Sequence, residues 1–304
     1  MPAIPQYFLD GVVYLYKDEQ SAREGKEFGG SGFLISVPSK THMNHPHTYV
    51  VSNWHVAVRD GFSVVRINTT EGDGGTDVIT FDSSDWEFIP DGGDVAVASI
   101  ELRQGFHKVR CLDPTDFLVR GWEHFFEIGE DVFMLGRFID LGGEQTNQPA
   151  ARFGNISVRP THLDDTANGD AATRYYLLDM HSRTGFSGSP VFAYRTMGSV
   201  IGQKLGGKIF HDRDGGVERI ELPIHEPIVK LLGIHCGQFT DEMTVESPSG
   251  KSVLVGPSGM TFALPTSRIV DVLNCAKFVE RRKAADLKIK HENLVLRPET
   301  SWTI

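Results

Sequence analysis

Short apolar and β-branched runs, separated by glycine, proline and aspartate, recur along most of the chain and restrict the folds that it can adopt. Runs of this length, broken at short intervals by turn residues, predict β-strands in a barrel or sandwich. Six are expected in each half: Gly11–Tyr16, Gly32–Val37, Thr48–Ser52, Ser63–Asn68, Asp77–Phe81 and Val95–Leu102, then Asp131–Phe138, Ala151–Val158, Arg174–Met180, Pro190–Arg195, Val229–Cys236 and Met260–Leu264. The sequence therefore predicts an all-β protein.

One helix is expected near the end of the chain, at residues 265–276. Its apolar side chains recur at helical spacing: Ile269, Val272, Leu273 and Ala276. Thr266 or Ser267 is placed to cap its first turn. Residues 279–304 are polar and charged, and we expect them to be solvated or packed along the surface rather than to form a further domain.

Two loops are longer than a minimal β-protein needs. Residues 38–47 hold His42, His45 and His47, but no carboxylate or cysteine lies beside them, so a solvated loop is favoured over a metal site. Residues 196–228 are expected to form a β-excursion with a tight turn, and the functional alternative is an exosite or regulatory flap.

Three polar residues lie where strands end or turns begin, and together they suggest nucleophilic catalysis. Ser187 lies in the glycine-rich segment 185–190, which can form a tight turn with exposed N–H groups. His55 follows the run at 48–52, and Asp94 precedes an apolar run. Taken singly they could be a turn serine, a core or loop histidine and a strand cap. Together they supply a nucleophile, a base and the carboxylate that orients the base.

The order of these residues separates two classes of hydrolase. In an α/β-hydrolase the serine precedes the acid and the histidine, and a glycine stands two positions after the serine. Here the order is His55, Asp94, Ser187, and Ser189 occupies the position where that glycine would be. The chain therefore does not fit the α/β-hydrolase pattern.

Four segments in this order resemble the trypsin-like serine protease superfamily, in particular HtrA-type and bacterial trypsin-like proteases: Gly30–Ile35, Ser52–Val56, Asp94–Val97 and Gly185–Pro190. The resemblance covers roughly residues 29–274 and implies a chymotrypsin-like fold of two six-stranded antiparallel β-barrels with a C-terminal helix. It divides the chain into an N-terminal barrel at 1–117 with His55 and Asp94, a C-terminal barrel and helix at 118–278 with Ser187, and a polar tail at 279–304.

The resemblance also implies an oxyanion hole formed by the backbone N–H groups of Gly185 and Ser187. Phe186 stands where vertebrate digestive trypsins carry the aspartate that receives a freed N-terminus. Activation of that kind is not expected, so the turn is either preformed or ordered by another contact.

The substrate-binding residues implied by the resemblance are Ser182, His235 and Gly237. Residues 179–190 and Gly233–His235 resemble glutamyl endopeptidases, and viral chymotrypsin-like cysteine proteases use a similar histidine. A histidine and a serine hydroxyl can donate hydrogen bonds to a carboxylate or amide oxygen, which favours Glu, Asp or Gln at P1. The alternative is a structural His235 and a pocket for small or apolar side chains. No aspartate is placed at the pocket base, which disfavours Lys or Arg.

Composition limits the partners and the compartment. The 304 residues carry a net charge of −10, which argues against nucleic-acid binding. No apolar run approaches the ~20 residues of a membrane helix, and the N-terminus does not resemble a secretory signal. Three widely spaced cysteines, Cys111, Cys236 and Cys275, favour reduced thiols and a cytoplasmic protein.

The function predicted from the sequence is thus a serine endopeptidase that acts on protein or peptide substrates, with no cofactor and no metal. A regulatory partner is left open. The alternative is a catalytically silent protease-fold binding or regulatory module, because a sequence does not show whether the three residues are aligned.

Overall fold

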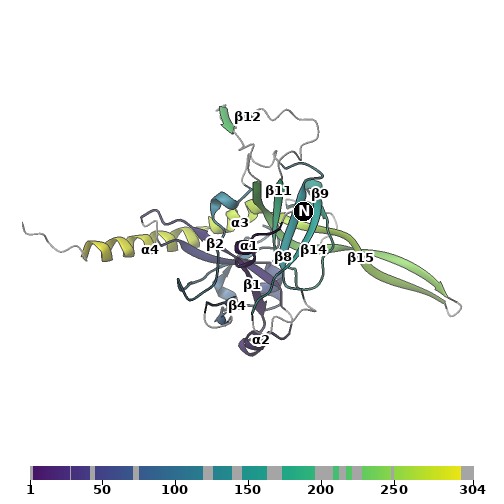
Figure 1. The fold of residues 1–304 in the computed structure, drawn as a ribbon, viewed down its shortest axis with the longest axis horizontal. Coiled ribbons are helices and arrows are strands. Elements are labelled where there is room, and N and C mark those ends of the chain that lie inside the picture. The colour runs from purple at the N-terminus through teal and green to yellow at the C-terminus, as the bar shows by residue number, and fades with distance from the viewer. Residues whose placement is uncertain are drawn as a thin grey trace, which may run out of the picture.

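The protein is mostly β and is seen here in a computed structural model (Figure 1). The structure describes residues 3–27, 29–41, 45–70, 75–118, 126–138, 146–162, 173–195, 208–211, 217–220, 228–247 and 250–295. Its strands gather into two large sheets, one from each half of the chain, and a separate hairpin. The predicted fold class is therefore confirmed.

The first half forms one barrel-like antiparallel sheet, of seven strands rather than the six expected, with the order β5-β4-β1-β2-β3-β7-β6. We call this sheet the first barrel. Its strands are β1 (Val12–Tyr16), β2 (Ser31–Val37), β3 (His47–Ser52), β4 (Val64–Asn68), β5 (Thr76–Thr80), β6 (Trp86–Glu87) and β7 (Ala96–Ser99). Two short helices, α1 (Gln6–Leu9) and α2 (Glu19–Glu24), flank β1 in the chain. The two-residue strand β6 was not expected, because it is too short to show any alternation of apolar and polar residues.

The second half forms a closed barrel with the order β10-β15-β14-β11-β8-β9. Its strands are β8 (Asp131–Gly136), β9 (Ala150–His162), β10 (Arg174–Asp179), β11 (Pro190–Arg195), β14 (Ile228–Ser247) and β15 (Gly250–Pro265). Between β11 and β14, β12 (Lys208–His211) pairs with β13 (Val217–Ile220), as expected for a β-excursion. The remaining residues of 196–228, apart from Ile228 at the start of β14, lie outside the described residues.

Strands β14 and β15 are much longer than expected and leave the barrel together. Strand β10 pairs with β15 only over Met260–Ala263, and β11 pairs with β14 only up to Ile234. Beyond these pairs the two strands continue as a two-stranded ribbon, from Thr240↔Pro257 to Ser247↔Gly250. We call residues 240–247 and 250–257 the arm. Figure 1 shows it at one end of the long axis of the molecule, opposite helix α4.

The C-terminal region contains two helices. Helix α3 (Thr266–Leu273) was expected, but the predicted side-chain cap was wrong, because the Thr266 hydroxyl donates to the carbonyl of Leu231 (2.6 Å) instead. Helix α4 (Ala276–Val295) occupies most of the sequence expected to be a polar tail. Its Phe278 is fully buried, so its start is anchored in the protein.

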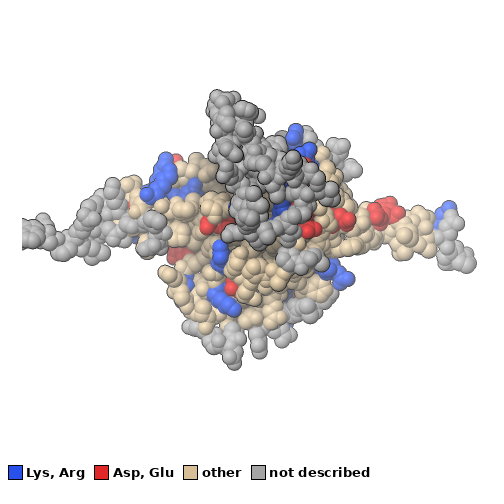
Figure 2. All heavy atoms as spheres, turned by 45° about the horizontal axis from the view of Figure 1, so that its top comes forward, with Lys and Arg blue, Asp and Glu red and all other residues tan. Residues whose placement is uncertain are grey.

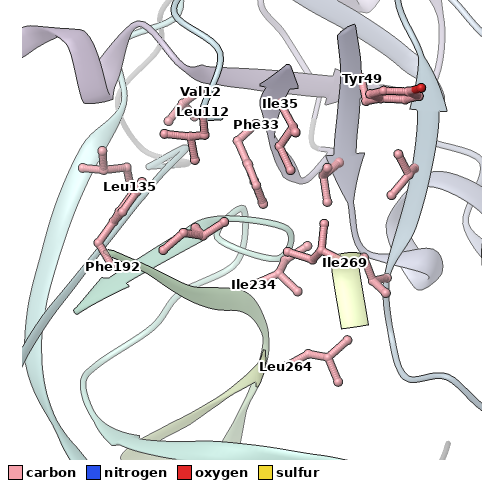
Figure 3. Close-up of a cluster of buried hydrophobic side chains, with 14 of the residues drawn as sticks. Val12, Phe33, Ile35, Tyr49, Leu112, Leu135, Phe192, Ile234, Leu264 and Ile269 are labelled. Atoms are coloured by element: carbon pink, nitrogen blue, oxygen red, sulfur yellow. The ribbon is translucent and has the colours of Figure 1, made fainter. Parts of the chain in front are cut away.

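One buried apolar cluster joins the two halves (Figure 3). Phe33 and Ile35 of β2 lie in it together with Phe192 and Ile234 of the second barrel, and Ile269 of α3 closes one side. Burial of such side chains is worth roughly 1.5–3 kcal/mol each. The two barrels are therefore fixed against each other, which is a requirement for a site between them.

The histidine-rich loop is attached to α4. His47 Nε2 and Ser39 Oγ both hydrogen-bond to Asp286 Oδ1 (3.0 and 2.7 Å). Burial would raise the pKa of Asp286, but the hydrogen bonds from Ser39, His47 and the Lys40 N–H lower it overall. No cluster of metal-ligating side chains occurs among the described residues, and His42 lies outside them. Among the residues that the structure describes, no helix is long and apolar enough to cross a membrane.

Candidate active site

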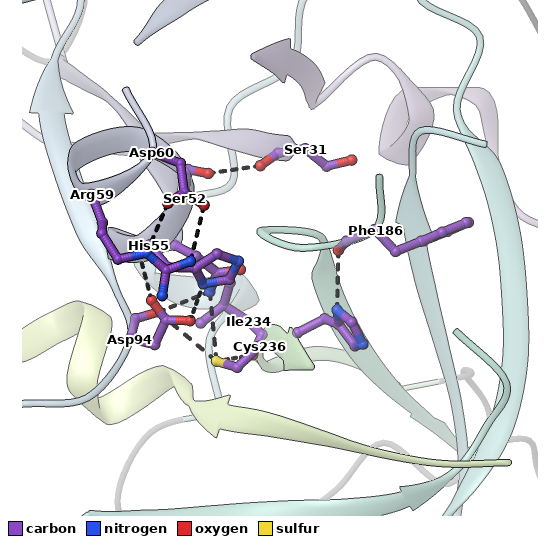
Figure 4. Close-up of polar contacts among 11 residues, drawn as sticks. Ser31, Ser52, His55, Arg59, Asp60, Asp94, Phe186, Ile234 and Cys236 are labelled. Carbon is purple, nitrogen blue, oxygen red and sulfur yellow. Dashed lines mark hydrogen bonds and ion pairs between the residues drawn. The ribbon is translucent and has the colours of Figure 1, made fainter. Parts of the chain in front are cut away.

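His55 and Asp94 form the best-defined pair of the candidate site (Figure 4). His55 Nδ1 lies 2.5 Å from Asp94 Oδ2, and the His55 backbone N–H donates to Asp94 Oδ1 (2.9 Å). Because Nδ1–H donates a hydrogen bond to the carboxylate, the neutral ring keeps its Nε2 lone pair available. A base held in this tautomer can accept a proton from a nearby hydroxyl.

The first sheet positions this pair. Strand β3 pairs with β7 through Ser52↔Ala96, so His55, just after β3, and Asp94, just before β7, emerge at the same end of the sheet. The chain turns at once into a single π-helical turn, His55–Arg59, and the His55 side chain stays half-buried, with 18% of it exposed. Asn53 Nδ2 donates to the Asp94 carbonyl (2.8 Å) and fixes the backbone of the acid.

The nucleophile segment forms a tight turn with two outward N–H groups. Phe186 N donates to the Arg183 carbonyl (3.2 Å), and Gly185, at the third position of this turn, has φ +97°. Thr184 has no positive φ, so the turn is of type II, which needs glycine at that position. The N–H groups of Gly185 and Ser187 have no acceptor among the described residues. They are free to hydrogen-bond an oxyanion.

Ser31 of β2 holds this turn from the opposite barrel, a role that sequence reasoning missed. Its hydroxyl donates to the Gly185 carbonyl (2.7 Å) and accepts from Arg137 N (2.8 Å). Its backbone N–H donates to the Ser187 carbonyl (2.7 Å). The sequence signal was a hydroxyl at the start of a strand whose next four residues are apolar and buried. The turn is therefore ordered in this structure by contacts from the other barrel.

Gly188 lets the two barrels approach this closely. It has φ +85°, and a Cβ there would lie 2.0 Å from the Ser31 carbonyl oxygen and 2.6 Å from Ser52 Oγ. Only glycine fits both the conformation and the space. The Phe186 side chain is fully buried in the core of the second barrel, so the residue before Ser187 anchors the turn through packing.

A cavity of about 360 Å³ lies between the barrels and is open to solvent. His55 and Ser187 both line it, as do the other predicted site residues except Asp94: Ser182, Gly185, His235 and Gly237. No hydrogen bond joins the Ser187 and His55 side chains within the described structure. Such contacts are often long without substrate and tighten when it binds.

His235 contacts the nucleophile turn as well as the cavity. Its Nδ1–H donates to the Phe186 carbonyl (3.1 Å), and its buried Nε2 has no partner within the described structure. Burial lowers the pKa of His235 to about 4, while the Phe186 carbonyl acts in the opposite direction. The ring is therefore neutral near pH 7, with Nε2 as an acceptor rather than the donor expected from the sequence.

Two of the three cysteines are poor candidates for a nucleophile. All three are free thiols, as expected. Cys236 Sγ lies 3.8 Å from the Asp94 carbonyl oxygen, and burial raises the pKa of its thiol well above its ordinary value. Burial also raises the pKa of Cys111 to about 12. A protonated, buried thiol is unreactive.

Comparison with known proteins assigns the family. The family described as Trypsin-like peptidase domain matches residues 30–202, which is more than half of the chain and includes His55, Asp94 and Ser187. The chain belongs to this family and carries a trypsin-like serine protease domain. A search of curated proteins finds no significant match.

Two solved structures of similar fold are the protease domain of MamO from Magnetospirillum magneticum and the Rv3671c protease from M. tuberculosis in its inactive form. The first is 16% identical, with a TM-score of 0.48, and the alignment covers 87% of this chain and 96% of that chain. The second is 17% identical, with a TM-score of 0.42, and the alignment covers 87% of this chain and 88% of that chain. Identities this low transfer no residue roles to this chain.

Proposed function

We propose that this chain is a serine endopeptidase that cleaves peptide bonds through an acyl-enzyme. Ser187 Oγ attacks the scissile carbonyl, His55 takes the hydroxyl proton and returns it to the leaving amine, and Asp94 stays ionised and orients the ring. The N–H groups of Gly185 and Ser187 stabilise the oxyanion. The observation that carries this proposal is the 2.5 Å contact between His55 and Asp94 at a cavity that Ser187 also lines.

We further propose that Ser182, His235 and Gly237 contact the P1 residue and favour Gln, Glu or Asp. Support comes from their place in the cavity wall and from the unpartnered Nε2 of His235. With Nδ1–H committed to Phe186, the neutral ring accepts a hydrogen bond from a Gln amide, and the Ser182 hydroxyl donates to the side-chain oxygen. A carboxylate cannot donate to Nε2, so Glu and Asp gain only as His235 becomes protonated toward pH 4.

A peptide-library profile tests both statements. At pH 7.5 the wild type should cleave after Gln more readily than after Glu, and the Glu share should rise as the pH is lowered. His235→Ala should lose this preference among the peptides that it still cleaves, whereas Ser187→Ala should lose all cleavage. A wild-type preference for Lys, Arg or large apolar residues that His235→Ala leaves unchanged would contradict the P1 assignment without touching the triad. Cleavage by Ser187→Ala would contradict the triad itself.

A further inference from the structure

Strand β14 has an unpaired edge that begins in the catalytic cavity. On one side it pairs with β15 to the end of the arm. On the other side β11 pairs with it only to Ile234, and the nucleophile turn reaches His235 through the Gly188 N–H and the Ser189 carbonyl. Within the described residues, β14 beyond His235 pairs only with β15. Its other edge therefore presents free N–H and C=O groups, which are a template for a further strand.

In the arm, residues 240–245 and 251–255 are exposed, and several of them are apolar. Met243 and Leu254 face each other across the ribbon and are 66% and 57% exposed. Val245 lies on the same face, because successive side chains alternate along a strand. Glu242 and Thr244 lie on the opposite face, next to the free edge. A two-stranded ribbon is only marginally stable alone, so exposed apolar residues on it indicate a surface that binds another segment.

The free edge continues the wall of the cavity. Gly237 and Gln238 line the cavity together with Ser187, and the arm follows directly after them in β14. In the proposed reaction His55 gives a proton to the leaving amine, so the leaving group lies on the His55 side. The acyl part of the substrate, which lies N-terminal to the scissile bond, then lies on the β14 side.

We propose that the arm binds the part of the substrate N-terminal to the scissile bond by adding it as a strand to the free edge of β14. Because β14 runs outward from the cavity and this part of the substrate runs inward toward Ser187, the pairing is antiparallel. The distance from Gln238 to Val245 is seven residues, or about 24 Å of extended chain. This inference rests on the proposed function and names its substrate class.

The arm also specifies the chemistry of that segment. Substrate side chains on the face of Met243 and Val245 meet apolar surface, and those on the other face meet Glu242 and Thr244. Figure 2 shows acidic residues along the arm, and Asp241 and Glu242 are both exposed. The arm thus fits an unfolded polypeptide whose apolar residues alternate with basic or hydroxyl-bearing ones. Main-chain pairing supplies affinity and the alternate side chains supply selectivity.

A substrate-length series tests the proposal. Two peptides share the cleavage site that the library profile selects. One extends about four residues before the scissile bond, and the other extends about twelve, with alternating Leu and Lys. We expect the longer peptide to be cleaved with at least a tenfold higher kcat/KM. This advantage of the longer peptide should vanish when the enzyme is the double variant Met243→Ser/Val245→Ser. It should also vanish when alternate backbone amides of the peptide's upstream segment are N-methylated. Leu287→Ser is the control, because Leu287 is an exposed apolar residue (57%) of α4, and α4 lies at the opposite end of the long axis from the arm.

Binding to the Ser187→Ala variant separates this inference from the proposed function. Fluorescence anisotropy should show tighter binding of the longer peptide to Ser187→Ala, and hydrogen exchange should slow in residues 237–247. These results would support the arm even if no cleavage were found. Equal kcat/KM for both peptides, or a length advantage kept by Met243→Ser/Val245→Ser, would overturn the proposal. A dimer that light scattering detects in the wild type and that dissociates in Met243→Ser/Val245→Ser would also overturn it, because the arm would then pair with a second copy of the chain.

Discussion

Removing the Ser31 hydroxyl should slow catalysis with little effect on substrate binding. Ser31→Ala deletes the hydrogen bond to the Gly185 carbonyl and the one accepted from Arg137 N, both in a fully buried place. Each is worth about 1 kcal/mol, and the groups left unpaired add to the cost, so the variant should lose roughly 2–4 kcal/mol of stability. The turn that carries the proposed oxyanion donors, the N–H groups of Gly185 and Ser187, would also lose its fixed geometry.

The catalytic effect is bounded by the loss of one oxyanion donor, about 10²–10³ in kcat. Because Ser31→Ala loosens the Gly185 donor without deleting it, we expect kcat to fall about 10- to 100-fold, with KM within about threefold. Thr266→Val is the matched control, because it removes another buried hydroxyl-to-carbonyl bond, between residues that do not line the cavity. It should lose stability and keep kcat. A Ser31→Ala enzyme with unchanged kcat, or one in which only KM rises, would refute the reasoning.

Three further predictions concern the acid, the buried histidine and the C-terminal helix. Asp94→Asn should lower kcat about 10⁴-fold with little change in KM, since an amide favours the wrong tautomer of His55, and single-turnover kinetics measure this. His235 titrates near pH 4 in the folded protein, beside His55 and Asp94, and near 6.5 when unfolded. The unfolded state thus binds the proton more readily, and the free energy of unfolding should fall by up to about 3 kcal/mol as the pH drops from 6.5 to 4. Urea unfolding of the wild type and of His235→Gln measures this fall. An equal fall in both proteins would contradict the prediction. Asp286→Ala leaves Ser39 and His47 without their acceptor and should cost about 2–4 kcal/mol in calorimetry. Asp271→Ala, which breaks an exposed pair with Arg268, should cost under about 1 kcal/mol, and an equal loss in both variants would argue against docking through Asp286.

The sequence predicted those parts of the molecule that have a local pattern. Strands such as β2 and β11 are continuous apolar runs between turn residues, and they occur within a residue of the expected bounds. His55 and Asp94 were predicted from the strand ends beside them, and Ser187 from the glycine-rich segment around it. The pairing of β3 with β7 then brings His55 to Asp94, and the closed second barrel brings Ser187 to the same cavity.

The arm and α4 were missed for different reasons. The arm is exposed on both faces, so no burial pattern marks it, and Gly256, Pro257 and Gly259 favour a loop. Helix α4 was judged by its polarity, although alanine, lysine, arginine and glutamate, which fill it, are strong helix formers. Ser31 and His235 act on the nucleophile turn from positions 154 and 49 residues away in sequence, through contacts that only the tertiary structure defines.

The central claim is that Ser187 is a nucleophile activated by His55 and Asp94. Labelling with a fluorophosphonate probe tests it without knowledge of the substrate. The account predicts that one probe molecule attaches to the wild type, that peptide mapping places it on Ser187, and that His55→Ala and Asp94→Asn slow the reaction strongly. Ser187→Ala should not be labelled, and its melting temperature should stay close to that of the wild type, because a turn serine contributes little packing. Labelling that persists in Ser187→Ala, or a wild type that folds and is not labelled, would contradict the account.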